Sequence, residues 1–180
     1  MKSVSDDGKL AAPYSEIAAT IQRLKDKGRK YDETERLLQR ILQFSEIAAK
    51  REMLMDANAV TVVAGHLRTN DCASVQQNAA TILLNLSQCD RGRHGMISCG
   101  SWDCVSYRHA CPLFYLLQLT VNTTDILVKR ISAAAVVNCS FHAACQAHIE
   151  DVGGINLLLK MLKLNDEGMS SCVVSSTSTL

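Results

Sequence analysis

The fold is decided by one stretch, Val75-Gln-Gln-Asn-Ala-Ala-Thr-Ile-Leu-Leu-Asn-Leu-Ser87, which the chain repeats in altered form. A second copy begins 53 positions later and reads Val128-Lys-Arg-Ile-Ser-Ala-Ala-Ala-Val-Val-Asn-Cys-Ser140. A weaker copy lies 42 positions earlier, where Leu42-Gln-Phe-Ser45 aligns with Leu84-Asn-Leu-Ser87. A period near ~40 residues, built from helix-forming residues, is typical of a stacked helical solenoid. The sequence therefore predicts an all-α array, which offers an extended face to other macromolecules rather than one enclosed pocket.

The composition fits a folded, helical chain. Of the 180 residues, 47% are hydrophobic, and only two are proline and three phenylalanine, which argues against a β-sandwich. Lys and Arg number 19 against 18 Asp and Glu, so the charge balance gives no reason to expect a nucleic acid or a membrane surface as partner. The apolar pattern shows neither a signal peptide nor a membrane span. We therefore expect the protein in the cytoplasm, with a nuclear location as a second option. In that reducing setting the eight cysteines are expected to be buried thiols.

The pattern divides the chain into four segments. We expect a flexible arm over residues 1–13, an amphipathic helix with a basic linker over 14–30, the repeat array over 31–163, and a polar, disordered tail over 164–180. The middle repeat predicts a short helix over 50–56, a second over 59–67 and a long helix over 75–88. The first repeat shows only its long helix, and the fourth shows none, so the array has incomplete ends.

One apolar stripe marks the long helix of the middle repeat as a core element. It consists of Val75, Ala79, Ile82, Leu83 and Leu86. A stripe of this width is expected of a helix that packs against neighbours on both sides.

Two of these pieces resemble the armadillo repeat family. Gly153-Gly-Ile-Asn-Leu-Leu-Leu-Lys-Met-Leu162 is similar to the family's glycine-initiated second helix, and the stretch from Val75 to Ser87 is similar to its third. Asn85 and Asn138 favour this family over the related HEAT repeat. The resemblance implies a right-handed α-solenoid of three-helix repeats of about 42 residues, of which this chain would hold about three.

The strongest candidate binding residues are long-helix positions that superpose between repeats and lie off the apolar stripe. They are Gln39, Gln43, Thr81, Asn85, Ala134 and Asn138. The resemblance implies that the two asparagines line a concave groove and hydrogen-bond the backbone of an extended peptide. The alternative is that each asparagine caps or bridges backbone within its own repeat. Importin-like members carry a tryptophan where this chain has Thr81 and Ala134, which argues against recognition of basic nuclear import signals.

An insertion interrupts the period between the second and third long helices. The step of 53 rather than 42 places it near residues 101–111. We interpret it as a surface excursion, and one alternative is a loop that contacts a partner through Trp102 and Tyr107. Another alternative is an alternatively spliced segment that was not selected to fold there.

The cysteines and histidines do not predict a metal site. Cys139, His142, Cys145 and His148 are spaced three apart, and on one continuous helix each step of three turns the side chain by about 300°, so the four cannot converge on one ion. The insert's Cys99, Cys104, His109 and Cys111 have irregular spacing. No catalytic or phosphate-binding motif is present either. We therefore expect no catalytic residues, no metal and no cofactor, and a zinc- or cysteine-dependent enzyme is a remote alternative.

The resulting functional hypothesis is a non-catalytic scaffold that binds a protein or an extended peptide segment along the groove. The resemblance suggests cytoskeletal or ciliary proteins, chaperone clients or ubiquitin-pathway proteins as partners. The alternative is a truncated or alternatively spliced regulatory isoform of a longer repeat protein. A weaker contact is suggested by the last residues, Ser178-Thr179-Leu180, which resemble the carboxyl-terminal motif that PDZ domains accept.

Overall fold

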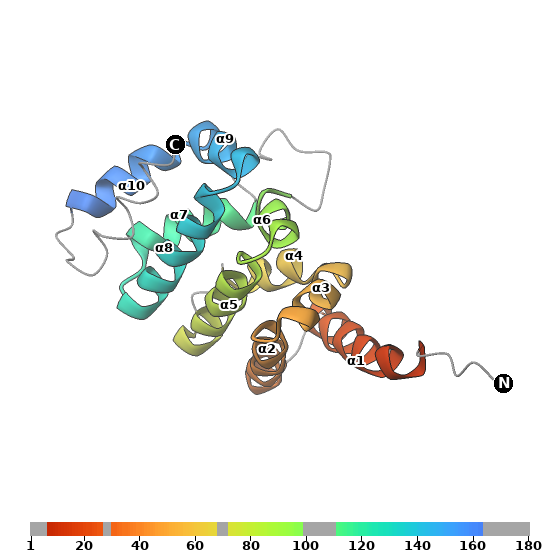
Figure 1. The fold of residues 1–180 in the computed structure, drawn as a ribbon. Coiled ribbons are helices and arrows are strands. Elements are labelled where there is room, and N and C mark those ends of the chain that lie inside the picture. Colours follow the sequence, from red (N-terminus) through yellow and green to blue (C-terminus); the bar gives the residue numbers. More distant parts are fainter. Residues whose placement is uncertain (1–6, 27–29, 68–71, 99–110, 164–180) are drawn as a thin grey trace.

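Three long helices, stacked side by side, form the backbone of the array. The computed structural model describes residues 7–26, 30–67, 72–98 and 111–163, and all regular structure in them is helical. The long helices are α2 (Tyr31–Ser45), α5 (Ala73–Leu86) and α8 (Ile126–Ser140). In Figure 1 they lie next to one another in chain order, and α5 packs against both α2 and α8. The predicted all-α fold is confirmed.

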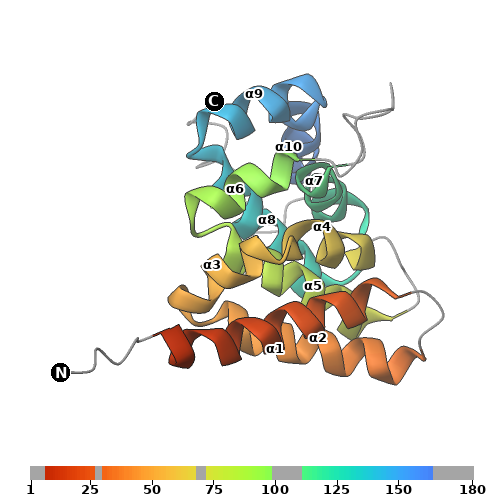
Figure 2. The same ribbon diagram turned by 90° about the vertical axis from the view of Figure 1, so that its right-hand side faces the viewer.

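Shorter helices complete the repeats on the other side of the long ones. Two precede α5: α3 (Ala48–Asp56) and α4 (Ala59–Ala64), the latter followed by the single 3-10 turn η1 (Gly65–Leu67). Two precede α8: α6 (Asp90–Ile97) and α7 (Pro112–Asn122). The last two are α9 (Ala143–Asp151) and α10 (Gly154–Lys163), which no long helix follows in the described residues. Figure 2 shows these units stacked from α1 and α2 at one end to α9 and α10 at the other.

The first helix starts earlier than the sequence pattern indicated. Helix α1 spans Asp7–Lys25, whereas the periodicity predicted a flexible arm up to residue 13 and a helix from Tyr14. Proline disfavours a helix interior, which argued against a helix across Pro13, but the preceding Leu-Ala-Ala run favours helix and α1 continues through this position. Further along, Ile17, Ile21 and Leu24 are buried, and α1 packs against α2.

The core is continuous from one repeat to the next. All five members of the predicted stripe on α5 are buried. Equivalent positions stay apolar through the array: Phe44, Leu86 and Cys139 align in the three long helices and all three are buried. A core shared between neighbours ties the stability of each repeat to that of the next.

A left-handed residue makes the turn between the first two helices of a repeat. Asn58 has φ 58° between α3 and α4, and Gly153 has φ 69° at the equivalent place between α9 and α10. Glycine and asparagine are the residues that enter this region at the lowest cost. The same left-handed turn therefore recurs between α3 and α4 and between α9 and α10, the first two helices of the second and fourth repeats.

The last described helix keeps part of an apolar face open. Ile155 and Leu159 on α10 are 36% and 44% exposed, while Leu158 and Met161 are buried. This agrees with the predicted incomplete fourth repeat. The insert residues Trp102 and Tyr107 and the terminal Ser178, Thr179 and Leu180 lie outside the described residues, so their predicted roles stay predictions.

Candidate binding face on the long helices

A fully buried serine stands at the C-terminal end of each long helix, as the last residue of α2 and α8 and as the residue that follows α5. The serine hydroxyl donates a hydrogen bond to the carbonyl oxygen three residues earlier. The pairs are Ser45 with Leu42 at 2.7 Å, Ser87 with Leu84 at 2.7 Å, and Ser140 with Val137 at 2.8 Å. Because the single hydroxyl proton is used in this bond, the oxygen of each serine can act only as an acceptor towards other groups.

The two predicted ladder asparagines use these serines as partners. Nδ2 of Asn85 lies 2.9 Å from Oγ of Ser45, and Nδ2 of Asn138 lies 2.9 Å from Oγ of Ser87. Each asparagine therefore binds a side chain of the preceding repeat, not the backbone of its own repeat as the alternative prediction had it. Both asparagines are half-buried, and in the described residues neither the second N–H nor the carbonyl oxygen of either amide has a hydrogen-bond partner.

The other predicted ladder positions lie on the same three neighbouring helices. Gln39 and Gln43 on α2 are exposed, and Oε1 of Gln43 accepts a hydrogen bond from Arg40 at 3.0 Å. Thr81 on α5 is half-buried and bonds the carbonyl oxygen of Gln77 in its own helix at 2.8 Å. Ala134 on α8 is half-buried and carries no polar group. Of the six positions, the two asparagines are the ones that hydrogen-bond another repeat within the described residues.

A second repeated contact closes the corner after each long helix, and the sequence analysis missed it. Six residues beyond each terminal serine, a long polar side chain donates to the carbonyl oxygen of that serine. The pairs are Arg51 with Ser45 at 2.7 Å, Arg93 with Ser87 at 3.0 Å, and Gln146 with Ser140 at 2.7 Å. The signal was available as serine followed at the sixth position by Arg, Arg or Gln, but it becomes visible only when the three copies are aligned.

Asp125 connects the start of α8 to α5. Its Oδ1 accepts the backbone N–H groups of Leu127 and Val128 at 2.8 and 3.1 Å, which caps the helix. Its Oδ2 accepts a hydrogen bond from Nε2 of Gln77 at 2.8 Å. The bond from Gln77, followed by those from the backbone, lowers the pKa of the Asp125 carboxyl below its ordinary value. At the other junction, the hydroxyls of Tyr31 and Ser74 lie 2.9 Å apart.

The cysteine and histidine series is not on one helix, so the geometric premise used against a zinc site was wrong. Helix α8 ends at Ser140 and α9 begins at Ala143, which places His142 in the turn between them. The neighbouring Cys145 side chain, and then burial, raise the pKa of the Cys139 thiol, whereas the same Cys139 contact lowers the pKa of Cys145 against the opposing effect of its burial. Sγ of Cys145 donates to the carbonyl oxygen of Arg93 at 3.3 Å.

The fourth member of the series has a different partner. Nε2 of His148 lies 2.8 Å from Sγ of Cys111, the N-cap residue of α7. Within the described ranges, no three ligand-type side chains are placed to hold a metal ion.

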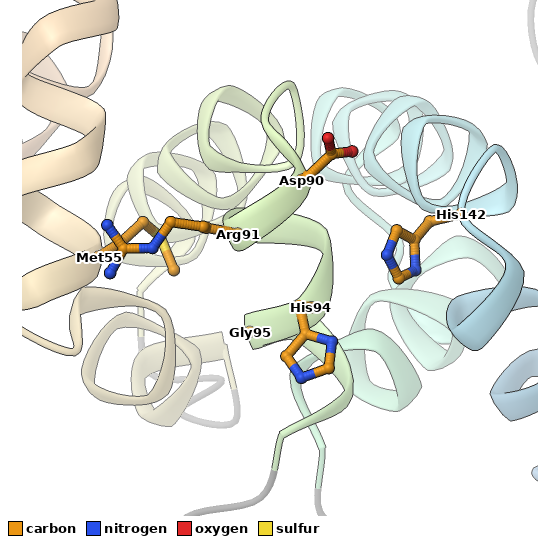
Figure 3. Close-up of a pocket in the computed structure, with 6 residues that line it drawn as sticks. All are labelled: Met55, Asp90, Arg91, His94, Gly95 and His142. Atoms are coloured by element: carbon orange, nitrogen blue, oxygen red, sulfur yellow. The ribbon is translucent and has the colours of Figure 1, made fainter.

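A shallow pocket of about 380 Å³ lies on the short-helix side of the array (Figure 3). Its lining residues are Met55, Asp90, Arg91, His94, Gly95 and His142. The guanidinium of Arg91 is held by Glu52 and Asp56 at 2.8 and 2.7 Å, and these two carboxylates raise its pKa. The rings of His94 and His142 meet edge to face with centroids 6.3 Å apart. No residue of the asparagine ladder lines this pocket.

Comparisons with known proteins identify the fold. One engineered protein superposes with a TM-score of 0.74 at 18% identity, over 92% of this chain and 62% of its own. A designed armadillo repeat protein gives 0.72 at 16% identity, over 91% of this chain and 63% of its own. The chain has the armadillo repeat fold.

One more structural match agrees with this fold, whereas the comparisons by sequence found no match. A computationally designed armadillo repeat protein for modular peptide recognition gives a TM-score of 0.75 at 15% identity, over 92% of this chain and 64% of its own. The chain thus spans less than two thirds of the length of each of these three structures. No protein-family model matches the sequence, and no curated protein matches it. None of the helices in the described residues is long and apolar enough to cross a membrane.

Proposed function

We propose that this armadillo-type array is a non-catalytic scaffold that binds an extended segment of a partner protein across its long helices. The observation that carries the proposal is the state of Asn85 and Asn138. One N–H of each amide is used by the serine of the preceding repeat, and the other N–H and the carbonyl oxygen are without a partner in the described residues. Each asparagine therefore offers one donor and one acceptor in a fixed orientation.

A peptide backbone is the natural complement of such a pair. Each peptide unit also carries one donor and one acceptor, so a fixed amide can bind it whatever the side chain. Packed helices are ~8–10 Å apart, and an extended chain advances ~3.3 Å per residue. A segment crossing from Asn85 to Asn138 would therefore span two to three residues. The serine bond also holds the amide in place before binding, which reduces the entropy lost on association.

The fold comparison supports the proposal at a general level. One structural neighbour is described as designed for modular peptide recognition, and the likeness to it is one of fold. Cytoskeletal or ciliary proteins, chaperone clients and ubiquitin-pathway proteins are the partner classes suggested by the family resemblance. Thr81 and Ala134, which replace the tryptophans of importin-like members, favour a segment other than a basic import signal.

The test begins with a ligand selected on the protein itself. Random twelve-residue peptides displayed on phage are selected against the full chain, and the tightest one is synthesised with a fluorophore. Its Kd is then measured by anisotropy for two double variants, Asn85→Ala with Asn138→Ala and Ser45→Ala with Ser87→Ala. Both variants lose the same two bonds between repeats, but only the first removes the free amide groups.

The proposal predicts that the asparagine variant loses about tenfold or more in affinity, since each net hydrogen bond is worth ~0.5–1.5 kcal/mol. The serine variant should stay within about threefold, because its amides remain on the surface. Equal losses in the two variants would show that the asparagines only hold the repeats together, and the proposal would be abandoned.

A further inference from the structure

The ladder asparagines belong to a longer strip on each long helix. On an α-helix, residues four, seven and eleven positions before a given residue lie within about 40° of it. On α8 the strip that ends at Asn138 is Leu127, Ile131, Ala134 and Asn138. On α5 it is Ser74, Asn78, Thr81 and Asn85, and on α2 it is Asp32, Arg36, Gln39 and Gln43. We call these twelve residues the ladder strip.

The character of the ladder strip changes from one helix to the next. On α2 it contains an acid, a base and two amides; on α5 it contains only neutral polar side chains; on α8 three of four side chains are apolar. The helices are adjacent in the order α2, α5, α8 (Figure 1), so polarity falls steadily across the face. A surface that only faced solvent would not require this decrease in polarity from α2 to α8.

The apolar part of the strip is partly accessible, although Ile131 also packs against the core. Leu127 is 48% exposed, and Ile131 and Ala134 are half-buried. The strip lies beside the open side of α8, not at its centre. Gln77 bonds Asp125 and therefore lies on the side of α5 that faces α8. Arg130 occupies the equivalent position on α8, so it lies on the side of α8 that faces away from α5. Counted around the helix from that side, Ala134 lies at about 40°, Leu127 at about 60°, Asn138 at about 80° and Ile131 at about 100°.

The charged part of the strip has no internal partners. In the described residues Asp32 and Arg36 make no ion pair. Their neighbours do: Glu33 pairs with Arg23 at 2.8 Å, and Arg40 pairs with Glu16. Ion pairs thus form next to the ladder strip but not within it. The opposite charges of Asp32 and Arg36 therefore remain available to a bound partner.

We propose that Leu127, Ile131 and Ala134 form an apolar subsite that gives the bound segment its direction. The segment places an aliphatic or aromatic side chain over α8 and charged side chains over Asp32 and Arg36 on α2. This inference rests on the proposed function, because it assigns side-chain specificity to the face whose asparagines hold the backbone. Backbone hydrogen bonds alone would accept a segment with little regard to its side chains, and the subsite supplies the selection.

The test uses the selected peptide and a version of it in which each aliphatic or aromatic residue is replaced by serine. The protein variant is Leu127→Ser together with Ala134→Thr, which gives α8 the side chains of the equivalent α5 positions Ser74 and Thr81. The control is Ile126→Ser, which removes a neighbouring aliphatic side chain that is 55% exposed and about 100° away from Leu127 around the helix. All these positions are at least partly exposed, and a thermal melt of each variant confirms that it folds.

The wild-type chain should prefer the aliphatic peptide over the serine peptide by about tenfold or more, as expected for one well-seated side chain. The strip variant should lose most of that preference, and Ile126→Ser should keep it. If the strip variant and the control keep the same preference while the asparagine variant loses binding, the subsite is refuted and the proposed function stands. If the asparagine variant binds as the wild type does, the proposed function fails and the subsite fails with it.

Discussion

The amide nitrogen of Asn138 on α8 donates a hydrogen bond to the hydroxyl of Ser87 at the end of α5, across 2.9 Å. The same bond joins Asn85 to Ser45 one repeat earlier, at the same distance. Each bond fixes a long helix to its predecessor and also fixes the amide that the helix presents. Structural and binding roles, which the sequence analysis treated as alternatives, are therefore compatible in the same side chain.

The contribution of the Asn138–Ser87 hydrogen bond to the free energy of unfolding can be measured by comparison with Ser140. Ser87→Ala and Ser140→Ala both remove a buried hydroxyl that donates within its own helix, but only Ser87 also accepts from an asparagine. We expect Ser87→Ala to lower the free energy of unfolding by about 1 kcal/mol more than Ser140→Ala, the net worth of one hydrogen bond. Urea denaturation followed by circular dichroism measures both, and equal losses would contradict the assignment.

The corner contact predicts which replacements of Arg51 are tolerated. Gln146 makes the same bond to a serine carbonyl that Arg51 makes, at the same 2.7 Å. Arg51→Gln should therefore stay within about 0.5 kcal/mol of the wild type, while Arg51→Ala should lose about 1 kcal/mol by leaving that carbonyl unpaired. Thermal melts of the two variants decide the point, and a larger loss for glutamine than for alanine would refute the role of the contact.

The stability of the array should depend on pH through the carboxylate of Asp125. Its carboxyl pKa is lowered in the folded chain by Gln77 and by two backbone N–H groups, so its stabilising effect is present above the unfolded pKa of ~3.9 and is lost as the pH falls through the folded value. Asp125→Ala should cost about 1 kcal/mol at pH 7 through loss of the cap.

The control for this prediction is Asp125→Asn, which keeps a capping oxygen but carries no charge. The difference in unfolding free energy between wild type and Asp125→Asn should shrink as the pH is lowered from 6 towards 3. A difference that stays constant over that range would show that the carboxylate charge contributes nothing.

The core of the middle repeat should not accept a charge. Leu83 is fully buried on α5, so Leu83→Asp places a carboxylate where no partner or water can reach it. We expect a loss of about 4 kcal/mol or more, enough to unfold a domain of ordinary stability. Gln88→Asp, at an exposed position just beyond the same helix, serves as control and should retain the wild-type helical spectrum. A folded Leu83→Asp chain would contradict the assignment of this stripe to the core.

The repeat in the sequence was sufficient to predict the helices and their core, because burial recurs at the same positions in each copy. Alignment of Leu86 with Cys139, for example, predicted a buried cysteine. It could not predict the partners of the asparagines, since a hydrogen bond between helices depends on how far one helix is rotated and shifted against the next. The zinc argument failed for a related reason: the break between Ser140 and Ala143 is invisible to a spacing rule that assumes one continuous helix.

The site itself was predicted only in part. Asn85 and Asn138 were named from their positions in the repeat, whereas the gradient from Asp32 to Leu127 emerges only once α2, α5 and α8 are known to be neighbours in that order. Gln39 and Gln43, named for the same reason, have not gained a contact that distinguishes them from other exposed residues of α2.

Binding by the asparagine amides can be observed by NMR on the ¹⁵N-labelled chain, with the side-chain NH₂ signals of Asn85 and Asn138 assigned through the two Asn→Ala variants. On titration with the selected peptide, both pairs of signals should shift together and saturate at the Kd measured by anisotropy. If the peptide binds while both pairs stay in place and shifts are confined to the short helices, such as the pocket beside His94 and His142, then the long-helix face is not the binding site.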